Sequence, residues 1–476
     1  DAYINLGGML KEIGLLEKAL DVTLMAISLN PEQAVAHVNY GVILQEMGQL
    51  DQALDATNKA IALNPGIADM HMNLALILQE CGQLDQALAA VLKAIDLDPY
   101  HANSYTLLGR LHEVNGDLIK ARNLFTRSLQ INPQQGWAYY ETSKNLASLN
   151  EATIILDLIR VMPKVTLSYR DSMFLAFARS NCYHMHKDFF NSAKCLVEAN
   201  KIKKRLHPSD KNHYISSAKR LLLSTDHETT INSSLGQGRV FIVGIPRCGS
   251  SLVQTVLSTN PLAVDLGENS ALSKAISKLI VGRQKLTSRT LEDLYLDHLN
   301  IPIPASGITL DKQLYNYISS GHIACNMPAA KIIHCRRNPL DNILSMFRAN
   351  LAAGNNYSSS LEDSAEVLIS QEQLMMHFKD LFPSAIYTLS YETLVNDPDH
   401  EIRRLVAWLE WDWNDDYLEP HLTTRSINTA SVIQARQPIS NKSVGGWSKY
   451  AEMLEPARRV LIESGLFDNE ILFPCI

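Results

Sequence analysis

The stretch Arg239-Val-Phe-Ile-Val-Gly244-Ile-Pro-Arg247-Cys-Gly249-Ser-Ser251-Leu-Val-Gln-Thr-Val-Leu-Ser-Thr259 decides the fold of the second half of this 476-residue chain. It begins with an apolar run, Val240–Val243, continues through a loop bounded by two glycines, and ends with apolar residues at helical spacing over 252–257. This pattern predicts a strand, a tight loop and a helix. A loop of this shape places backbone N–H groups at a helix N-terminus, where they can hold a phosphate or a similar anion.

The loop departs from the common nucleotide-binding pattern at one position. Gly244, Gly249 and Ser251 fit G-x-x-x-x-G-K-[ST], but Ser250 stands where that pattern has lysine. A triphosphate with Mg2+ needs the lysine, whereas a less charged group can be held by backbone N–H groups, two hydroxyls and Arg247. The missing lysine therefore argues against ATP or GTP hydrolysis and favours another adenylate-type donor.

Composition sets the class of the chain. With 46% apolar residues it can bury large cores, and its length is typical of about three domains. No apolar run is long enough to span a bilayer, and the N-terminus lacks both a starting Met and a signal peptide, which predicts a soluble chain that begins inside a longer precursor.

Charge and cysteine content narrow the class further. A net charge of −7 excludes a general surface for nucleic acid, so a phosphate site must be a local basic cluster. Seven cysteines at irregular spacing, without C-x-x-C, predict reduced thiols in the cytoplasm and no zinc site.

The first third of the chain is periodic. Glycine, alanine and proline recur every 34 residues, which is the period of a helix-turn-helix solenoid. In each repeat we expect a first helix (for example Ala34–Glu46), a glycine turn, a second helix (Leu50–Leu63), and an Asn-Pro or Asp-Pro sequence that ends it. The recurring residues are Gly14, Gly48, Gly82 and Gly116; Ala19, Ala53, Ala87 and Ala121; and Pro31, Pro65, Pro99 and Pro133.

Residues 1–135 hold four such repeats, and two roles remain open for them. They can be a spacer or a dimerisation arm that makes a homo-oligomer, or a groove that captures a protein or peptide acceptor. Residues 136–223 stay helical without the strict period, and Leu175–Arg205 contains one more helix pair. The cations within 201–205 are interpreted as a solvated helix end, because no aromatic residues accompany them. The polar residues 224–237 form a linker.

Residues 238–476 alternate strands and helices. Besides Val240–Val243, strands are predicted at Ala330–His334 and Ala385–Leu389, and each is followed by a helical pattern. This alternation predicts a parallel α/β sheet whose site lies at the carboxyl ends of the strands. Arg337 and Tyr391 follow directly after strands, as the glycine loop does.

Other polar residues are candidates for the functional site, although each also has an ordinary structural interpretation. Glu268 ends an extended run after the loop and can accept a proton from an attacking hydroxyl, although a lone glutamate is usually just solvated. Arg337 and Ser345, eight residues apart, can hold a phosphate by a guanidinium and a hydroxyl, although paired arginines also cap helices at surfaces. Residues 429–447, polar with Trp447 as an anchor, are predicted to form a lid over the donor.

These residues carry a family resemblance. Residues 1–135 resemble tetratricopeptide repeats. Residues 238 to about 450 resemble the sulfotransferases that use 3′-phosphoadenosine 5′-phosphosulfate (PAPS), in particular the bacterial repeat-containing group related to tyrosylprotein sulfotransferase. The family's 5′-phosphosulfate loop, F-x-x-G-x-P-R-S-G-T-[TS]-L, is matched by Phe241, Gly244, Pro246, Arg247, Gly249, Ser250, Ser251 and Leu252, with Cys248 inside it.

The resemblance implies a reaction and roles for further residues. It implies in-line transfer of a sulfuryl group from PAPS to an acceptor hydroxyl, with adenosine 3′,5′-bisphosphate (PAP) as product and no metal. Glu268 falls on the base and Lys312 on the lysine beside the bridging oxygen. The remaining donor-binding positions fall on the 3′-phosphate pair Arg337 and Ser345, on Tyr391, and on the late-loop Ser431. The acceptor stays open among protein tyrosine, carbohydrate, lipid and small-molecule hydroxyls, of which protein tyrosine or carbohydrate is favoured.

Three departures from the family's pattern stand out, and two of them, Cys248 and Gly446, support a second hypothesis. Cys248 replaces a loop serine, Gln313-Leu314 replaces the usual residues after Lys312, and Gly446 stands where relatives often carry a cation. The alternative is therefore a non-catalytic scaffold whose repeats bind a partner and whose nucleotide site is degenerate. A P-loop kinase or NTPase is disfavoured by Ser250.

Overall fold

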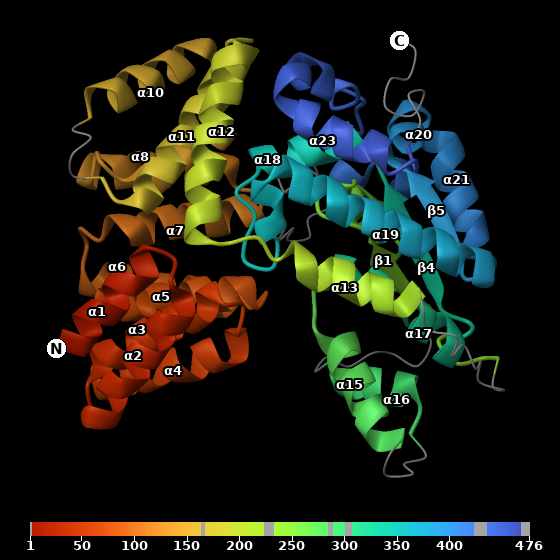
Figure 1. Cartoon of the computed structure of the whole chain (residues 1–476), viewed down its shortest axis with the longest axis horizontal. Helices are drawn as coiled ribbons and strands as arrows, with labels where there is room; N and C mark the ends of the chain where they lie inside the picture. The colour runs from red at the N-terminus through yellow and green to blue at the C-terminus, as the bar shows by residue number, and fades with distance from the viewer. Residues whose placement is uncertain are drawn as a thin grey trace. The chain divides into compact units, whose positions relative to one another are not determined.

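The computed structural model describes residues 2–162, 167–222, 233–283, 289–299, 307–422 and 436–467 (Figure 1). The structure divides into two units. The first contains the chain up to Asp210 together with Phe347–Ser360, and the second contains Lys211–Met346 and most of the residues from Leu361 onward. Part of the predicted linker and the whole stretch 423–435, which includes Ser431, lie outside the described residues. No helix in the described ranges is long and apolar enough to cross a bilayer.

The first unit is helical. Its helices α3 (Ala34–Glu46) and α4 (Leu50–Leu63) occupy the ranges expected from the sequence, so the helix-turn-helix prediction is confirmed. The other helices of this unit are α1 (Ala2–Glu12), α2 (Leu16–Leu29), α5 (Ala68–Glu80), α6 (Leu84–Leu97), α7 (Ala102–Val114), α8 (Leu118–Ile131), α9 (Gly136–Lys144), α10 (Leu149–Val161), α11 (Tyr169–Met185), α12 (Phe189–Leu206) and η3 (Asn356–Ser359).

Local sequence explains the repeat. A Cβ at Gly41 in α3 would lie 2.5 Å from Oγ1 of Thr57 in α4, so only glycine allows the two helices to approach this closely. Gly48, in the turn between them, has a φ of 75°, a left-handed conformation that costs glycine no steric strain. Asn64 ends α4 in an extended conformation, and the following Pro65 cannot continue the helix.

The interpretation of residues 201–205 as a solvated helix end is wrong at one position. Lys203 in α12 is 2% exposed, and its Nζ donates to the backbone O of Leu351 at 2.9 Å. Asn200, one turn earlier and also buried, donates to the backbone O of Phe347 at 2.8 Å. Burial lowers the pKa of Lys203 to about 7. Both side chains hold the distant segment 347–360, which the sequence of α12 does not reveal.

The second unit contains a parallel five-stranded sheet in the order β2-β3-β1-β4-β5, which confirms the predicted parallel α/β fold. Strand β1 lies between β3 and β4. Its residue Phe241 pairs with Asp311 of β3 on one side and with Ile332 of β4 on the other. The strands are β1 (Arg239–Val243), β2 (Ala263–Gly267), β3 (Ile308–Asp311), β4 (Lys331–Arg336) and β5 (Ile386–Ser390).

Apolar side chains cover both faces of the sheet, as expected for parallel strands. One cluster packs Phe241 and Ile332 against α13, α15, α16, α17 and α19, and Figure 1 shows α13 and α19 lying across this face. The other cluster packs Ile242 and Ile333 against α14 and α21.

The second unit has helices with the following residue ranges: α13 (Lys211–Leu222), α14 (Ser250–Leu257), α15 (Ala271–Arg283), α16 (Leu291–Asp297), η2 (Leu314–Ser319), α17 (Ser320–Asn326), α18 (Pro339–Arg348), α19 (Leu361–Leu381), α20 (Tyr391–Asn396), α21 (Pro398–Trp408) and α23 (Ala451–Glu463).

Candidate active site

The carboxyl ends of the five strands bring most of the candidate residues to one edge of the sheet. Because all the strands run in the same direction, the residue that follows each strand lies at this edge. The edge therefore carries Gly244 and its loop after β1, Glu268 after β2, Lys312 after β3, Arg337 after β4 and Tyr391 after β5.

The loop between β1 and α14 has an unusual backbone. Arg247 has a φ of 69° and Gly249 a φ of 99°, both in the left-handed region. A Cβ at Gly249 would lie 2.5 Å from Cδ2 of Tyr391, so the tyrosine ring packs directly on this glycine. The buried Asn342 donates to the backbone O of Pro246 at 2.7 Å. The loop conformation is thus held from both sides, by α20 and by α18.

Cys248 points away from solvent. Its side chain is 2% exposed, and the Cys335 thiol of β4 donates a hydrogen bond to its sulfur. That hydrogen bond lowers the pKa of Cys248, against the effect of burial, and Ser250 contributes in the same direction. The bond also raises the pKa of Cys335 well above its usual value. The cysteine at position 248, where the family has serine, therefore makes its side-chain contact with β4, beneath the loop.

The three residues after the loop glycine form the first turn of α14. Ser250 and Ser251 are buried, and Leu252 packs with the cluster on one face of the sheet. The helix N-cap is Gly249, which has no side chain that could accept a hydrogen bond from the backbone N–H groups of the first turn. These N–H groups are the donors that a helix N-terminus offers to an anion.

Arg337 is the centre of the basic side of the site. Its guanidinium donates to the backbone O of Arg247 at 3.2 Å and to the backbone O of Ser443 at 2.8 Å. Its Cζ lies 4.7 Å from the centroid of the Tyr391 ring. Its Nε is buried and has no hydrogen-bond partner among the described residues. A buried guanidinium N–H without an acceptor is suited to a phosphate oxygen.

Ser345, the other member of the predicted 3′-phosphate pair, is hydrogen-bonded to the loop arginine. Nε of Arg247 donates to Oγ of Ser345 at 3.0 Å. Arg337 in turn contacts the backbone of Arg247, so the three residues form one cluster. Arg337 and Ser345, the predicted 3′-phosphate pair, are therefore linked because both contact Arg247.

Glu268 and Lys312 form an ion pair at the other end of this edge. Nζ of Lys312 lies 2.6 Å from Oε1 of Glu268. The lysine side chain is 2% exposed and that of the glutamate 52%. The backbone N of Lys312 also donates to the backbone O of Gly267 at 3.0 Å. An almost fully buried ammonium thus faces a carboxylate that solvent and a substrate can reach.

Sequence reasoning missed the residues that support the site. Asp341 in α18 accepts hydrogen bonds from the backbone N of Gly445 at 2.7 Å and of Trp447 at 2.8 Å. These bonds and that of Arg337 to Ser443 fix the described part of the predicted lid. Glu392 accepts from the backbone N of Asn338 at 2.8 Å. The sequence signal that could have indicated Asp341 is the run Asn338-Pro-Leu-Asp-Asn342, which places polar residues at the start of an apolar helix.

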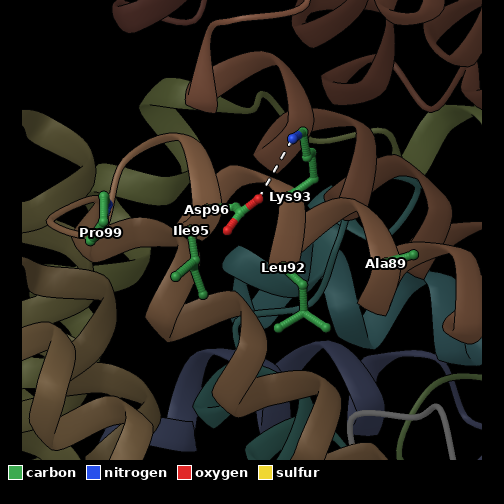
Figure 2. Close-up of a pocket in the computed structure, with 6 residues that line it drawn as sticks. All are labelled: Ala89, Leu92, Lys93, Ile95, Asp96 and Pro99. Atoms are coloured by element: carbon green, nitrogen blue, oxygen red, sulfur yellow. Dashed lines mark ion pairs between the residues drawn. The ribbon is translucent and has the colours of Figure 1, made fainter.

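A separate hollow lies on the repeats. It has a volume of about 600 Å³, and Figure 2 shows its lining, in which Lys93 and Asp96 of α6 form an ion pair at 3.6 Å. None of the candidate residues lines it, and the other lining residues are Ala89, Leu92, Ile95 and Pro99.

Family models match segments in both parts of the chain. Residues 269–415 match the model described as "Sulfotransferase family", and residues 34–67 and 66–134 match models described as "Tetratricopeptide repeat". The sulfotransferase match includes Lys312, Arg337, Ser345 and Tyr391 and begins one residue after Glu268. The chain thus carries tetratricopeptide repeats followed by a domain that matches the sulfotransferase family.

Individual relatives are distant. An uncharacterized protein of Aquifex aeolicus (strain VF5) is 26% identical over 340 residues, which are 66% of this chain and 44% of the relative, so the chain spans less than half of that protein. A Caenorhabditis briggsae protein described as a "putative protein-tyrosine sulfotransferase" is 23% identical over 44% of this chain and 80% of its own length.

Two solved structures are similar to parts of the chain. The sulfotransferase domain from the Synechococcus PCC 7002 olefin synthase has a TM-score of 0.36 and 17% identity, over 51% of this chain and 99% of its own. Pseudomonas aeruginosa PilF has a TM-score of 0.32 and 22% identity, over 46% of this chain and 96% of its own.

Proposed function

We propose that this protein transfers a sulfuryl group from PAPS to the hydroxyl of an acceptor. The observation that carries the proposal is the edge of the sheet. There the loop before α14, the Glu268–Lys312 pair, and an arginine whose buried Nε has no partner in the described part of the chain come together. The loop and the arginine suit the two phosphate-bearing ends of the donor, and the pair suits transfer to a hydroxyl.

The donor is held by charge and by the backbone. Arg337 and Ser345 bind its 3′-phosphate, and Nε of Arg337, which has no partner among the described residues, supplies one of the hydrogen bonds. Arg247 and the backbone N–H groups at the start of α14 bind the 5′-phosphosulfate, and Tyr391 packs against the nucleotide. The full set of donor-binding residues in this proposal is Arg247, Cys248, Gly249, Ser250, Ser251, Leu252, Arg337, Ser345, Tyr391 and Ser431, with Cys248 contributing its backbone.

Glu268 and Lys312 perform the transfer. The acceptor oxygen forms a bond to sulfur while the bond from sulfur to the bridging phosphate oxygen breaks. Glu268 takes the proton of the acceptor hydroxyl, and its half-exposed side chain is accessible to an acceptor. Lys312 stabilises the negative charge that develops on the leaving phosphate oxygen. The donor supplies the sulfuryl group, and the products are PAP and a sulfate ester.

The repeats recruit the acceptor in this proposal. A solenoid presents an extended surface suited to a protein or peptide, which favours a protein tyrosine as acceptor, with carbohydrate as the other candidate. The described cysteines are all free thiols, which supports a reducing compartment such as the cytoplasm.

Labelled-sulfate transfer tests the proposal. The full chain is incubated with PAPS carrying labelled sulfur and fractionated host lysate, and label is expected in protein or in glycan. The same preparation is melted with and without PAP, which at a hundred times its dissociation constant should stabilise the fold by about 2.7 kcal/mol. Absence of both label and stabilisation would favour the alternative, a non-catalytic scaffold that binds partners through its repeats.

A further inference from the structure

Asp311, the residue before Lys312, is a buried carboxylate with an unusual set of partners. It is 1% exposed and ends the strand β3, where its backbone is in register with Phe241 of β1 and Gly267 of β2. A carboxylate at the buried end of an interior strand is costly unless it is well hydrogen-bonded. Burial raises the pKa of Asp311 to about 6.

The carboxylate joins elements on two sides. The hydroxyl of Tyr295, in α16, donates to Oδ2 at 2.9 Å. The backbone N of Gln313 donates to Oδ1 at 3.0 Å, and Nδ2 of Asn316 donates to the same oxygen at 3.3 Å. The turn from β3 into η2 is therefore folded around the Asp311 side chain, with Lys312 inside this turn.

The same turn is hydrogen-bonded to the segment that carries Glu268. The backbone N of Lys312 donates to the backbone O of Gly267, and Nε2 of Gln313 donates to the backbone O of Asn269 at 3.5 Å. The two carbonyls on either side of Glu268 are thus held by the two residues that follow Asp311. A change in the turn would move the ammonium and the carboxylate relative to each other.

We propose that Asp311 is a positioning residue for the Glu268–Lys312 pair, acting by holding the 311–316 turn through Tyr295, the Gln313 backbone and Asn316. The inference rests on the proposed function. It extends that function to a residue that touches neither donor nor acceptor. In this inference, Asp311 aligns the two groups that carry out the transfer.

The test uses the full chain and three variants. Asp311→Asn keeps the size of the side chain but loses the charge and one acceptor oxygen, and Tyr295→Phe removes one hydrogen bond. Tyr317→Phe is the matched control, because Tyr317 is a fully buried tyrosine in the same apolar cluster whose hydroxyl has no partner among the described residues. Sulfuryl transfer gives kcat and the KM for the donor, and calorimetry gives the affinity for PAP.

A loss confined to kcat supports the inference. We expect kcat to fall at least tenfold in D311N and about threefold in Y295F, since about 1.4 kcal/mol corresponds to a tenfold change in rate. KM and PAP affinity should stay within twofold of wild type, and Y317F should match wild type throughout. If D311N does not fold, Y295F compared with Y317F decides the question.

Two results would overturn the inference. One is an unchanged kcat in Y295F and D311N. The other is a fall in kcat matched by an equal loss of PAP affinity, which would mean that Asp311 only supports the fold. A wild-type chain that transfers no sulfuryl group would instead refute the proposed function itself.

Discussion

Nζ of Lys312, an almost completely buried ammonium, lies 2.6 Å from Oε1 of Glu268, whose side chain is half exposed. A buried ammonium needs a close anion, because removing the charge from water is otherwise too costly. Here the anion is the residue proposed as the base, so one carboxylate compensates the lysine and, in the proposed reaction, also accepts the acceptor's proton. The first prediction follows from this relationship.

Replacing Glu268 by Gln should lower kcat by about a hundredfold or more, the range that general bases contribute. PAP should bind with nearly wild-type affinity, because Glu268 is not among the donor-binding residues. Sulfuryl transfer and calorimetry measure the two effects. Glu410→Gln is the control, since Glu410 is exposed and pairs with Lys331 away from the loop. Unchanged turnover in E268Q would remove Glu268 from the mechanism.

Replacing Arg337 by Ala should weaken PAP binding about 10- to 100-fold. The variant loses charge-assisted hydrogen bonds worth about 1.5–3 kcal/mol and the cation that stacks on Tyr391. Titration calorimetry with PAP measures the loss, and Arg403→Ala serves as a control because Arg403 is paired with Asp399 on an exposed helix face. Equal affinities of R337A and wild type would contradict the assignment of the 3′-phosphate.

Replacing Gly249 by Ala should destabilise the second unit by more than backbone strain alone. A φ of 99° costs alanine about 1 kcal/mol, and the contact of 2.5 Å with the Tyr391 ring adds about 1–3 kcal/mol. Gly465→Ala is matched, because Gly465 has a φ of 68° and a Cβ there meets nothing within 4 Å. Chemical denaturation of both variants measures the difference, and equal losses would show that the ring moves aside.

The buried Lys203 should make the stability of the first unit rise with pH. Its pKa is lowered from 10.5 to about 7 by burial, so between these values the unfolded chain binds a proton that the folded chain does not. The free energy of unfolding then increases with pH, by up to about 1.4 kcal/mol per pH unit for one proton. Denaturation at pH 7 and pH 9 should show this increase.

Two variants isolate the effect of Lys203 from that of other titrating groups. Lys203→Met should remove its share of the increase, so that the difference in unfolding free energy between wild type and variant grows from pH 7 to pH 9. Lys204→Met, at the exposed neighbouring position, should keep the wild-type slope. Identical slopes for K203M and wild type would mean that Lys203 titrates normally.

Much of the fold follows from short-range sequence. The recurring glycine, alanine and proline predict the repeats, because each acts within one helix pair, as Gly41 and Gly48 do. The strand-loop-helix around Gly244 and Gly249 is equally local. The parallel sheet then places the residues after its strands at one edge, so sequence order predicted that Arg337 and Tyr391 lie near the loop, whereas Glu268 was assigned to the site by the family resemblance.

Long-range contacts were decided by the tertiary structure. Within the sequence Cys248 looks like a lost hydroxyl, but β4 supplies Cys335 beneath it. Lys203 looks like a surface cation, but a segment about 150 residues later in the chain covers it with the carbonyl of Leu351. Asp311 looks like a polar residue at a strand end. These roles depend on which partner reaches the side chain, and pattern and spacing carry no information about partners so distant in sequence.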